Sequence, residues 1–230
     1  ADLDTVTRNV ERVSKKARSG DKESTIQKEL FERAQAALEQ GAQLRTMEWT
    51  DGERVLLKPL FLMTMKPVLF VANVSDDDMQ GESEQAQAVR AYAERTGAEM
   101  VALCGDIEGE LSQMEPDERG LFLEEMGLEE SGLQRLIHRA YKLLGMQTFF
   151  TAGEKEIRAW NILAGDTGPT AAGVIHTDFE KGYIRAEVFS VDDLVGYESE
   201  AAVKAAGKLR VEGRDYVMRE GDIAHFLIGK

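Results

Sequence analysis

The chain lacks the features typical of secreted and membrane proteins. It has one cysteine in 230 residues, so no disulfide can form within it, which favours a reducing, cytoplasmic compartment. No apolar run approaches ~18 residues, so no membrane span is expected. The opening residues 1–4 (ADLD) are acidic and do not resemble a signal peptide. Four prolines and no low-complexity tract predict no long disordered linker.

Signatures of a complete catalytic centre are also missing. The sequence contains no G-x-x-x-x-G-K-[ST] phosphate-binding loop and no G-x-G-x-x-G turn. The histidines 138, 176 and 225 are scattered without zinc spacing, and a structural role is favoured for each. The acidic stretches 76–78 and 124–130 are interpreted as solvated loops and helix ends, so no metal site is predicted.

Charge is mostly of one sign but is unevenly distributed. The chain contains 28 Lys and Arg and 42 Asp and Glu, so its formal net charge is −14. This negative charge argues against DNA binding or a general nucleic-acid coat. Residues 8–22 are the exception, with six basic and two acidic side chains. This basic stripe is a candidate contact with ribosomal RNA, and a solvated helix end explains it about equally well. Its members are Arg8, Arg12, Lys15, Lys16, Arg18 and Lys22.

Apolar residues near the N-terminus follow a helical period. Their spacing of three and four residues predicts a helix that ends at 19–21, with Leu3, Val6, Val10, Val13 and Ala17 on one side. A second helix is predicted from a Ser24 cap to Gly41, with an inner side formed by Ile26, Leu30, Ala34, Ala37 and Leu38. Together they predict an antiparallel hairpin of coiled-coil type with a basic tip.

The middle of the chain predicts one βαβ unit. Apolar runs at 68–72 and 100–104 flank a helix at 85–96, and both runs indicate parallel strands buried on both faces. Helices are expected at 116–126 and 131–144, the latter with an apolar side formed by Leu133, Leu136, Ile137, Ala140, Leu143 and Leu144. Because parallel sheets normally have more than two strands, and because no initiator Met is present, we expect a piece of a longer protein.

The sequence pattern of the C-terminal part is typical of strands and short helices. A β-hairpin is predicted from 148–151 and 157–162 around a turn at 152–155, with further strands at 184–189, 215–218 and 223–227. Helices are expected at 170–176, 191–195 and 198–206. Strands that wrap a helix in about 85 residues predict a compact α+β domain of ubiquitin-like, β-grasp type.

One motif follows the first predicted parallel strand. Ligands of open α/β sheets bind beyond the carboxyl ends of the strands, where residues 73–76 (NVSD) stand. The Asn73 amide could pair with a purine edge, and the Asp76 carboxylate could accept from a base. Asn and Asp are also ordinary turn residues, so the motif alone does not separate a base site from a simple turn.

Longer stretches resemble the YchF/Obg-like ATPase family. They are 66–74 (KPVLFVANV), 148–160 (TFFTAGEKEIRAW) and 171–186 (AAGVIHTDFEKGYIRA), supported by 212–216 and 221–223. The resemblance implies a helical coiled-coil arm at 1–45, the last part of a G domain at 46–145 and a TGS domain of β-grasp fold at 146–230. The implied fold class is α/β plus α+β, with an incomplete parallel sheet of P-loop NTPase type.

The resemblance also implies a function for the intact protein. Members of the family are cytoplasmic P-loop ATPases that hydrolyse ATP with Mg in preference to GTP and associate with ribosomes. The family's phosphate loop, switch regions and magnesium ligand would all precede residue 1. We therefore expect no catalytic or metal-binding residue within this chain, and no measurable ATPase activity from the chain alone.

A base pocket is implied by two matching loops. Asn73 and Val74 match the family's Asn-x-x-Glu motif, whereas Asp76 departs from its Glu and is the residue with which GTPases hold guanine. The second loop of the pocket matches Cys104 and Gly105, where backbone amides would face the base. Two alternatives stay open, a GTP-preferring enzyme and a non-enzymatic module that binds ribosomes or RNA.

Overall fold

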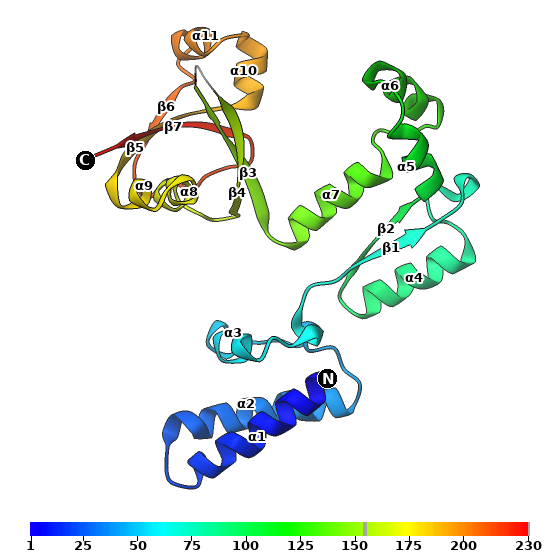
Figure 1. Ribbon diagram of the computed structural model, residues 1–230, viewed down its shortest axis with the longest axis vertical. Helices are drawn as coiled ribbons and strands as arrows, with labels where there is room; N and C mark the ends of the chain where they lie inside the picture. Colours follow the sequence, from blue (N-terminus) through cyan, green and yellow to red (C-terminus); the bar gives the residue numbers. More distant parts are fainter. Residues whose placement is uncertain (154–155, 230) are drawn as a thin grey trace. The chain divides into compact units, whose positions relative to one another are not determined.

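A computed structural model describes residues 1–153 and 156–229 (Figure 1). The chain divides into two compact units, Ala1–Arg139 and Ala140–Lys230. Helices occur in both units, with a two-stranded parallel sheet in the first and a five-stranded mixed sheet in the second. The expected combination of helices with parallel and mixed sheets is therefore confirmed. Within residues 1–153 and 156–229, no helix combines the length and the hydrophobicity of a membrane-spanning segment.

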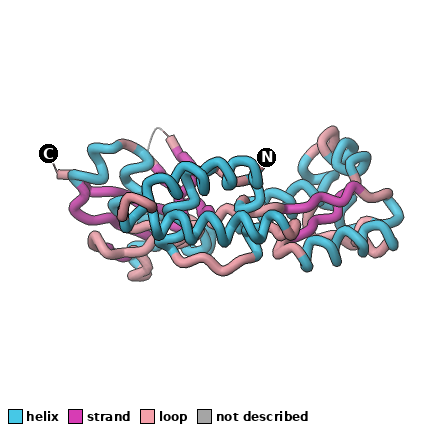
Figure 2. The backbone as a smooth tube through the Cα atoms, turned by 90° about the horizontal axis from the view of Figure 1, so that it is seen from below, coloured by secondary structure: helices cyan, strands magenta, loops and turns pink. Residues whose placement is uncertain are grey.

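The chain begins with two antiparallel helices, α1 (Asp2–Ala17) and α2 (Lys22–Glu39), which lie side by side in Figures 1 and 2. Val6 and Val13 of α1 are buried together with Leu30 and Ala34 of α2. These four residues belong to the apolar stripes that predicted the helices, because positions three or four apart share one helix face. The predicted hairpin is confirmed.

Two details of the second helix differ from the prediction. Ser24 is not its cap, because Asp21 occupies the N-cap position and accepts a hydrogen bond of 3.1 Å from the Ser24 amide. Ile26 is 60% exposed, whereas Phe31 is buried. The buried face of α2 runs through Ser24, Leu30, Phe31 and Ala34, and Ile26 lies outside it.

The base of the hairpin is closed by a segment of short helical turns. Helix α3 (Asp51–Leu57) is preceded by η1 (Leu44–Thr46) and followed by η2 (Lys58–Leu60) and η3 (Met63–Met65). Their apolar side chains complete the hairpin's core, namely Leu44, Trp49, Leu57 and Leu62. The Asp2 carboxylate accepts hydrogen bonds of 2.7 Å from both the backbone N–H and the hydroxyl of Thr64. These bonds tie the start of α1 to η3.

The βαβ unit is observed where it was predicted. Strand β1 (Leu69–Asn73) pairs in parallel with β2 (Glu99–Leu103), and α4 (Glu84–Arg95) connects them. The expectation that both faces of the first strand are buried is wrong for this structure, since Val71 is 47% exposed. Within the described residues β1 pairs with β2 alone, so a two-stranded sheet leaves part of its face open to solvent.

Three helices follow β2. They are α5 (Gly105–Leu111), which was not predicted, and α6 (Pro116–Glu125) and α7 (Gly132–Leu143), which were. The apolar side expected on α7 is largely uncovered, with Leu133 51% and Ile137 46% exposed. Helical periodicity identifies an apolar face, but it does not say whether another element packs on it.

The second unit is built on a sheet of strand order β4-β3-β7-β5-β6. Its strands are β3 (Met146–Ala152), β4 (Ile157–Leu163), β5 (Tyr183–Ser190), β6 (Arg210–Glu212) and β7 (Asp222–Ile228). Its helices are α8 (Gly168–Ile175), α9 (Thr177–Gly182), α10 (Val191–Tyr197) and α11 (Glu200–Ala205). The predicted hairpin of β3 and β4 is confirmed as an antiparallel pair, although Glu154 and Lys155 of its turn lie outside the described residues.

Helices cover both faces of this sheet. Phe149 and Ala224 pack with Ala171 and Ala172 of α8, whereas their strand neighbours Phe150 and Ile223 belong to a second cluster with α10 and α11. Because successive side chains of a strand point to opposite faces, the two clusters lie on opposite sides of the sheet.

One strand prediction in this unit is wrong. Residues 215–218 form a turn and a single bridge between Val217 and Thr167, and the strand on the outer side of β5 is β6. The segment's backbone groups bond to the loop before α8, where Gly168 N–H donates to the Tyr216 carbonyl at 2.9 Å. These partners are distant in sequence, so a local pattern did not reveal them.

Candidate functional site

Two loops that follow the parallel strands are joined by a hydrogen bond. Asn73 is the last residue of β1, and Cys104 and Gly105 follow β2. Both loops lie at the same edge, because the carboxyl ends of parallel strands are neighbours. The Gly105 N–H donates to Asn73 Oδ1 at 3.0 Å, and the Val74 N–H donates to the Leu103 carbonyl at 2.9 Å. The structure thus brings the two predicted halves of the base pocket together.

The bond from Gly105 decides what Asn73 can offer a ligand. Its Oδ1 is engaged, and no partner for its Nδ2 is found among residues 1–153 and 156–229. An exposed amide Nδ2 can donate to N7 of a purine, an acceptor that adenine and guanine share. A contact from Nδ2 to N7 alone therefore does not distinguish the two bases.

Gly105 and Cys104 contribute through the backbone. A Cβ at position 105 would lie 3.3 Å from Asn73 Oδ1, so glycine allows the two loops to approach closely. The amide of Gly105, expected to face a base, here donates to Asn73. The Cys104 side chain is 2% exposed and packs with Ile107 and Leu111, which fits its interpretation as a core thiol.

The remaining motif residues lie in the next turn. Val74 is half-buried, and Asp76 is exposed in the short turn η4 (Asp76–Asp78). No hydrogen bond to the Asp76 carboxylate is found in the described part of the chain, whereas Asp77 accepts one from the Ser75 hydroxyl. Asp76 therefore keeps its acceptor oxygens available for a base donor.

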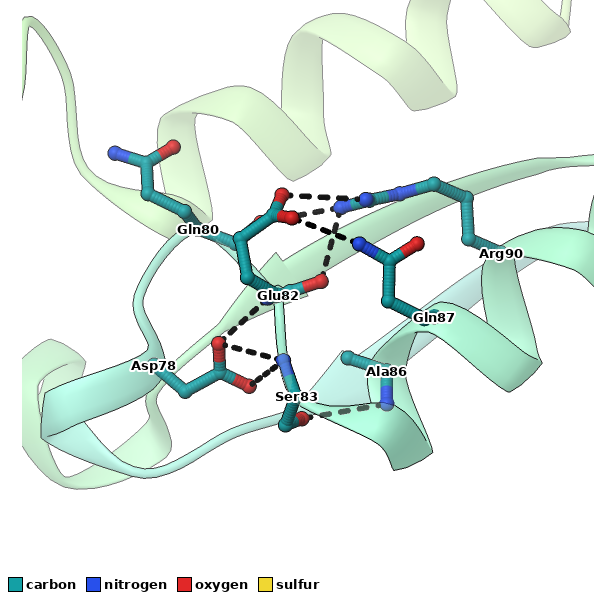
Figure 3. A network of polar contacts seen from close by, with 8 residues as sticks. Asp78, Gln80, Glu82, Ser83, Ala86, Gln87 and Arg90 are labelled. Atoms are coloured by element: carbon teal, nitrogen blue, oxygen red, sulfur yellow. Dashed lines mark hydrogen bonds and ion pairs between the residues drawn. The ribbon is translucent and has the colours of Figure 1, made fainter.

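A network that sequence reasoning missed fixes this turn (Figure 3). The Asp78 carboxylate accepts from the Glu82 N–H at 2.6 Å and from the Ser83 N–H at 3.1 Å. Hydrogen bonds to Ser83, first of all to its side chain, hold the pKa of Asp78 below its ordinary value of 3.8. Ser83 is also the N-cap of α4, so one carboxylate ties the turn to the start of that helix.

Arg90 of α4 holds the same segment from its other side. Its guanidinium donates to the carbonyls of Gln80 and Gly81, both at 3.1 Å, and to the Glu82 carboxylate at 3.3 Å (Figure 3). An Asp followed by Ser five residues later, before a helix, was the available signal for the bond between Asp78 and the Ser83 N–H. Nothing in the sequence pointed to Arg90.

A cleft of about 400 Å³ opens beside the motif. Asn73 and Val74 line it, together with Ala72, Ser75, Asp78, Ser83, Gln85, Ala86 and Val89. Asp76, Cys104 and Gly105 are not on its wall. The structure therefore brings Asn73 next to Gly105 and next to this cleft, but the five predicted residues do not share a single pocket.

The side chains of the predicted basic stripe are exposed to solvent. All six of its side chains are exposed, and none forms an ion pair among the residues that the structure describes. Arg8, Arg12 and Lys15 follow a spacing of four and three residues, so they share one face of α1, away from the buried Val6 and Val13. Arg8 and Arg12 also border a small groove of about 230 Å³.

The three histidines occupy separate places. His138 is exposed on α7 with its Nδ1 3.0 Å from Glu130, His176 caps α9, and His225 lies in β7. Over residues 1–153 and 156–229, no group of three His, Cys, Asp or Glu side chains is arranged to hold a metal ion.

Comparisons with known proteins bear on both units. A family model named YchF-GTPase_C, described as a protein of unknown function (DUF933), matches residues 146–229. The "Ribosome-binding ATPase YchF" of Bacillus subtilis is 43% identical over 98% of this chain and 62% of its own length. The chain is related to the YchF and Obg-like ATPases. The resemblance inferred from the sequence is thereby confirmed.

Two further relatives extend the likeness. "Obg-like ATPase 1" of Caenorhabditis elegans is 36% identical over 91% of this chain and 53% of its own length. The solved YchF GTPase of Schizosaccharomyces pombe matches 98% of this chain and 64% of its own with a TM-score of 0.80 and 28% identity. The chain spans 62% of the length of the first YchF relatives that it matches.

Proposed function

We propose that the chain is part of a YchF-type, ribosome-associated P-loop ATPase of the cytoplasm. The names of its relatives and their identity over nearly the whole chain support this proposal. Under it, residues 1–45 are the coiled-coil arm, 46–145 the end of the G domain and 146–230 a β-grasp TGS domain. The hairpin, the parallel βαβ unit and the five-stranded sheet are compatible with these assignments.

The role of this chain in the enzyme is to bind the purine base. The observation that carries this role is the bond between Gly105 and Asn73, which fixes the amide so that Nδ2 can meet N7. ATP is the proposed nucleotide, as in the names of the relatives, and GTP is the alternative because of Asp76. Since N7 is common to both purines, the contact from Nδ2 does not choose between them, and Asp76 is the carboxylate of the motif that could do so.

Phosphates and Mg require residues beyond those seen here. The described acidic turn does not fit a metal site, because Asp77 and Asp78 use their carboxylates on Ser75, Glu82 and Ser83. In P-loop enzymes the phosphates and metal are held by their own loops. We therefore expect no ATP turnover by the 230-residue chain above a buffer blank. If the chain hydrolysed ATP and an Asn73→Ala variant purified in the same way did not, this expectation would be wrong.

A nucleotide titration of the chain tests the base role. ATP and GTP are added to the isotope-labelled chain, and amide shifts of residues 73–76 and 104–105 are followed by NMR. Asn73→Ala should weaken binding about ten-fold, the size of one lost hydrogen bond. Asn161→Ala, which removes an exposed amide in the other unit, is the control and should change nothing. Equal affinity of the Asn73→Ala chain and the parent would overturn the base role.

The preference between purines depends on residue 76. We expect Asp76→Glu, which restores the family's residue, to raise the affinity for ATP relative to GTP. If the ratio of the ATP affinity to the GTP affinity does not change, Asp76 does not determine the base preference. Asp77→Glu is the control, because it makes the same change at a neighbouring carboxylate that is bonded to Ser75. The ratio of ATP to GTP affinity of the Asp76→Glu chain is compared with that of this control.

The six exposed cations of the basic stripe favour a second role, contact with ribosomal RNA. Phosphate contacts release counterions, so the affinity for ribosomes should fall with salt concentration. Pelleting with ribosomes is measured between low and high salt for the parent and for Lys15→Glu with Lys16→Glu. We expect the variant to bind more weakly and to show a flatter dependence of log affinity on log salt.

The matched control changes two lysines outside the stripe. Lys58→Glu with Lys66→Glu alters the net charge by the same amount on exposed side chains of the same unit. This variant should retain the slope of the parent. If both double variants lose affinity equally, net charge and not the stripe governs binding, and the RNA contact is refuted.

A further inference from the structure

Three arginines from two helices meet at a second cavity of the first unit. The cavity has a volume of about 170 Å³ and is lined by Arg90 of α4 and by Arg135 and Arg139 of α7. The rest of its wall is formed by Met79, Gln80, Met100, Val101 and Ala102. It shares no lining residue with the cleft beside Asn73.

The three guanidinium groups differ in how they are neutralised. Arg90 faces Glu82 at 3.3 Å, and Arg139 faces Glu99 at 2.8 Å. Arg135 has no carboxylate partner in the described residues, and its Nε is buried without a hydrogen-bond partner there. A buried donor without an acceptor costs free energy, so each such group calls for an explanation.

Composition does not explain this convergence. Residues 23–144 carry twice as many acidic as basic side chains, yet three of their arginines meet at one cavity. Several wall residues are apolar, namely Met79, Met100, Val101 and Ala102. Such a wall lowers the local dielectric constant and therefore strengthens the attraction for an anion.

Protection of a sheet edge accounts for part of the arrangement. Arg135 Nη2 donates to the Ala102 carbonyl of β2 at 3.0 Å, and charged side chains commonly cover the edges of sheets. This bond uses one of the five N–H donors of the guanidinium. It leaves the buried Nε of Arg135 without an acceptor.

We propose that this cavity binds a phosphoryl oxyanion. Guanidinium groups present forked donors that match phosphate oxygens, and three of them line this cavity. The volume exceeds that of one water, about 30 Å³ in the liquid, several-fold, so a phosphate group and ordered water fit. The phosphoryl group is either free or carried on a larger molecule.

The test follows the arginine side chains directly. The Nε–Hε signals of the isotope-labelled 230-residue chain are recorded while inorganic phosphate replaces chloride at constant ionic strength. We expect saturable shifts at Arg135 and Arg139, with smaller ones at Arg95, which lies over the Tyr92 ring away from the cavity. Shifts that grow linearly, or equally at all arginines, would overturn the proposal.

Two further probes distinguish the source of the phosphoryl group. Phenyl phosphate, a monoester dianion, should bind as well as inorganic phosphate if the group belongs to a larger molecule. Exclusion of phenyl phosphate would assign the cavity to free phosphate. Dimethyl phosphate, a diester with one charge, should bind more weakly than either. If acetate binds as well as phosphate, the cavity recognises carboxylates and the proposal fails.

Variants separate binding from folding. Arg135→Gln should reduce the affinity for phosphate about ten-fold, as expected for a lost charge-assisted hydrogen bond. Because this change also removes the bond to Ala102, Arg139→Gln serves as a second variant at a side chain that is 53% exposed. Arg95→Gln is the control for lost charge and should change the affinity less than about two-fold. Equal loss in all three variants would refute a specific site.

Discussion

The two sheets of the molecule differ in how fully they are covered. The five-stranded sheet has apolar clusters on both faces, with Phe149 and Phe189 almost completely buried. The two-stranded sheet leaves Val71 of β1 47% exposed. From the sequence, burial on both faces was expected for the parallel strands, because 68–72 and 100–104 are continuous apolar runs. A run of this kind specifies a strand, whereas its burial depends on elements elsewhere in the chain.

This difference implies different sources of stability. The second unit is stabilised by dense packing around its sheet. The first unit depends more on the core of the hairpin and on hydrogen-bond networks, such as that of Asp78 and Arg90. The two tryptophans allow the units to be observed separately, since Trp49 lies in the first and Trp160 in the second.

The largest effect is expected in the core of the second unit. Phe149→Ala removes a side chain with no exposed surface and should lower the free energy of unfolding by about 3–5 kcal/mol. Urea unfolding followed by Trp160 fluorescence measures this loss, while the Trp49 transition should remain in place. Ile157→Ala, at a side chain that is 76% exposed, should change the stability by less than about 0.5 kcal/mol. A joint shift of both transitions would show that the units do not unfold independently.

A smaller effect is expected in the polar network of the first unit. Gly81 has φ of +67°, and a Cβ there would lie 2.8 Å from the Ala102 Cβ. Gly81→Ala should therefore destabilise this region by about 1–3 kcal/mol. Faster hydrogen exchange of the Glu82 and Ser83 amides, which Asp78 binds, would report it.

The matched control for this variant is a glycine without such contacts. Gly109 lies within α5, where an added Cβ would meet no atom within 4 Å, and its φ is not positive. Gly109→Ala should leave the exchange of the same two amides unchanged, since alanine favours a helix. If the Glu82 and Ser83 amides exchanged at the same rate in both variants, Gly81 would have no role in holding the network together.

The smallest effect concerns pH, and its sign differs between the units. Hydrogen bonds from nearby Ser or Thr groups lower the pKa of several carboxyls of the first unit, among them Asp21, Glu53 and Asp78. Their stabilisation is complete above their ordinary pKa values of 3.8 to 4.5 and is lost as pH falls through the lower folded values. Burial raises the pKa of Tyr183 and Tyr216 of the second unit above 10.0, so their stabilisation is lost as pH rises above that value.

Single-tryptophan variants measure this contrast. We expect acid to shift the Trp49 unfolding transition first and alkali to shift the Trp160 transition first. The shifts should be small, because the carboxyls are exposed and solvent screens their interactions. If acid shifted the Trp160 unfolding transition before the Trp49 transition, the expected difference between the units would be wrong.

Most elements were predictable because their signals are local. The spacing of Val6, Val10 and Val13 specified α1, and the apolar run ending at Ala72 specified β1. Errors arose where distant contacts decide the structure. Residues 215–218 bond to the loop at 166–168, and nothing in their own sequence shows it. The cap of α2 was misplaced by three residues, because Asp21 and Ser24 are both good capping residues.

The candidate site was predictable only in part, for the same reason. Asn73 and Gly105 could be placed at one edge because both follow parallel strands. Arg90 and Arg135 were not identified, because their roles depend on where helices α4 and α7 place their side chains. Long side chains reach several residues along and across elements, so sequence spacing alone does not fix their partners.

The two bonds between Asp2 and Thr64 give the hairpin a mechanical property. With its base clamped, the hairpin acts as a lever, and the 16 residues of α1 make it about 24 Å long. Thr64 precedes strand β1 by a short segment. The base of this lever is therefore joined to the segment that leads into the strand ending in Asn73.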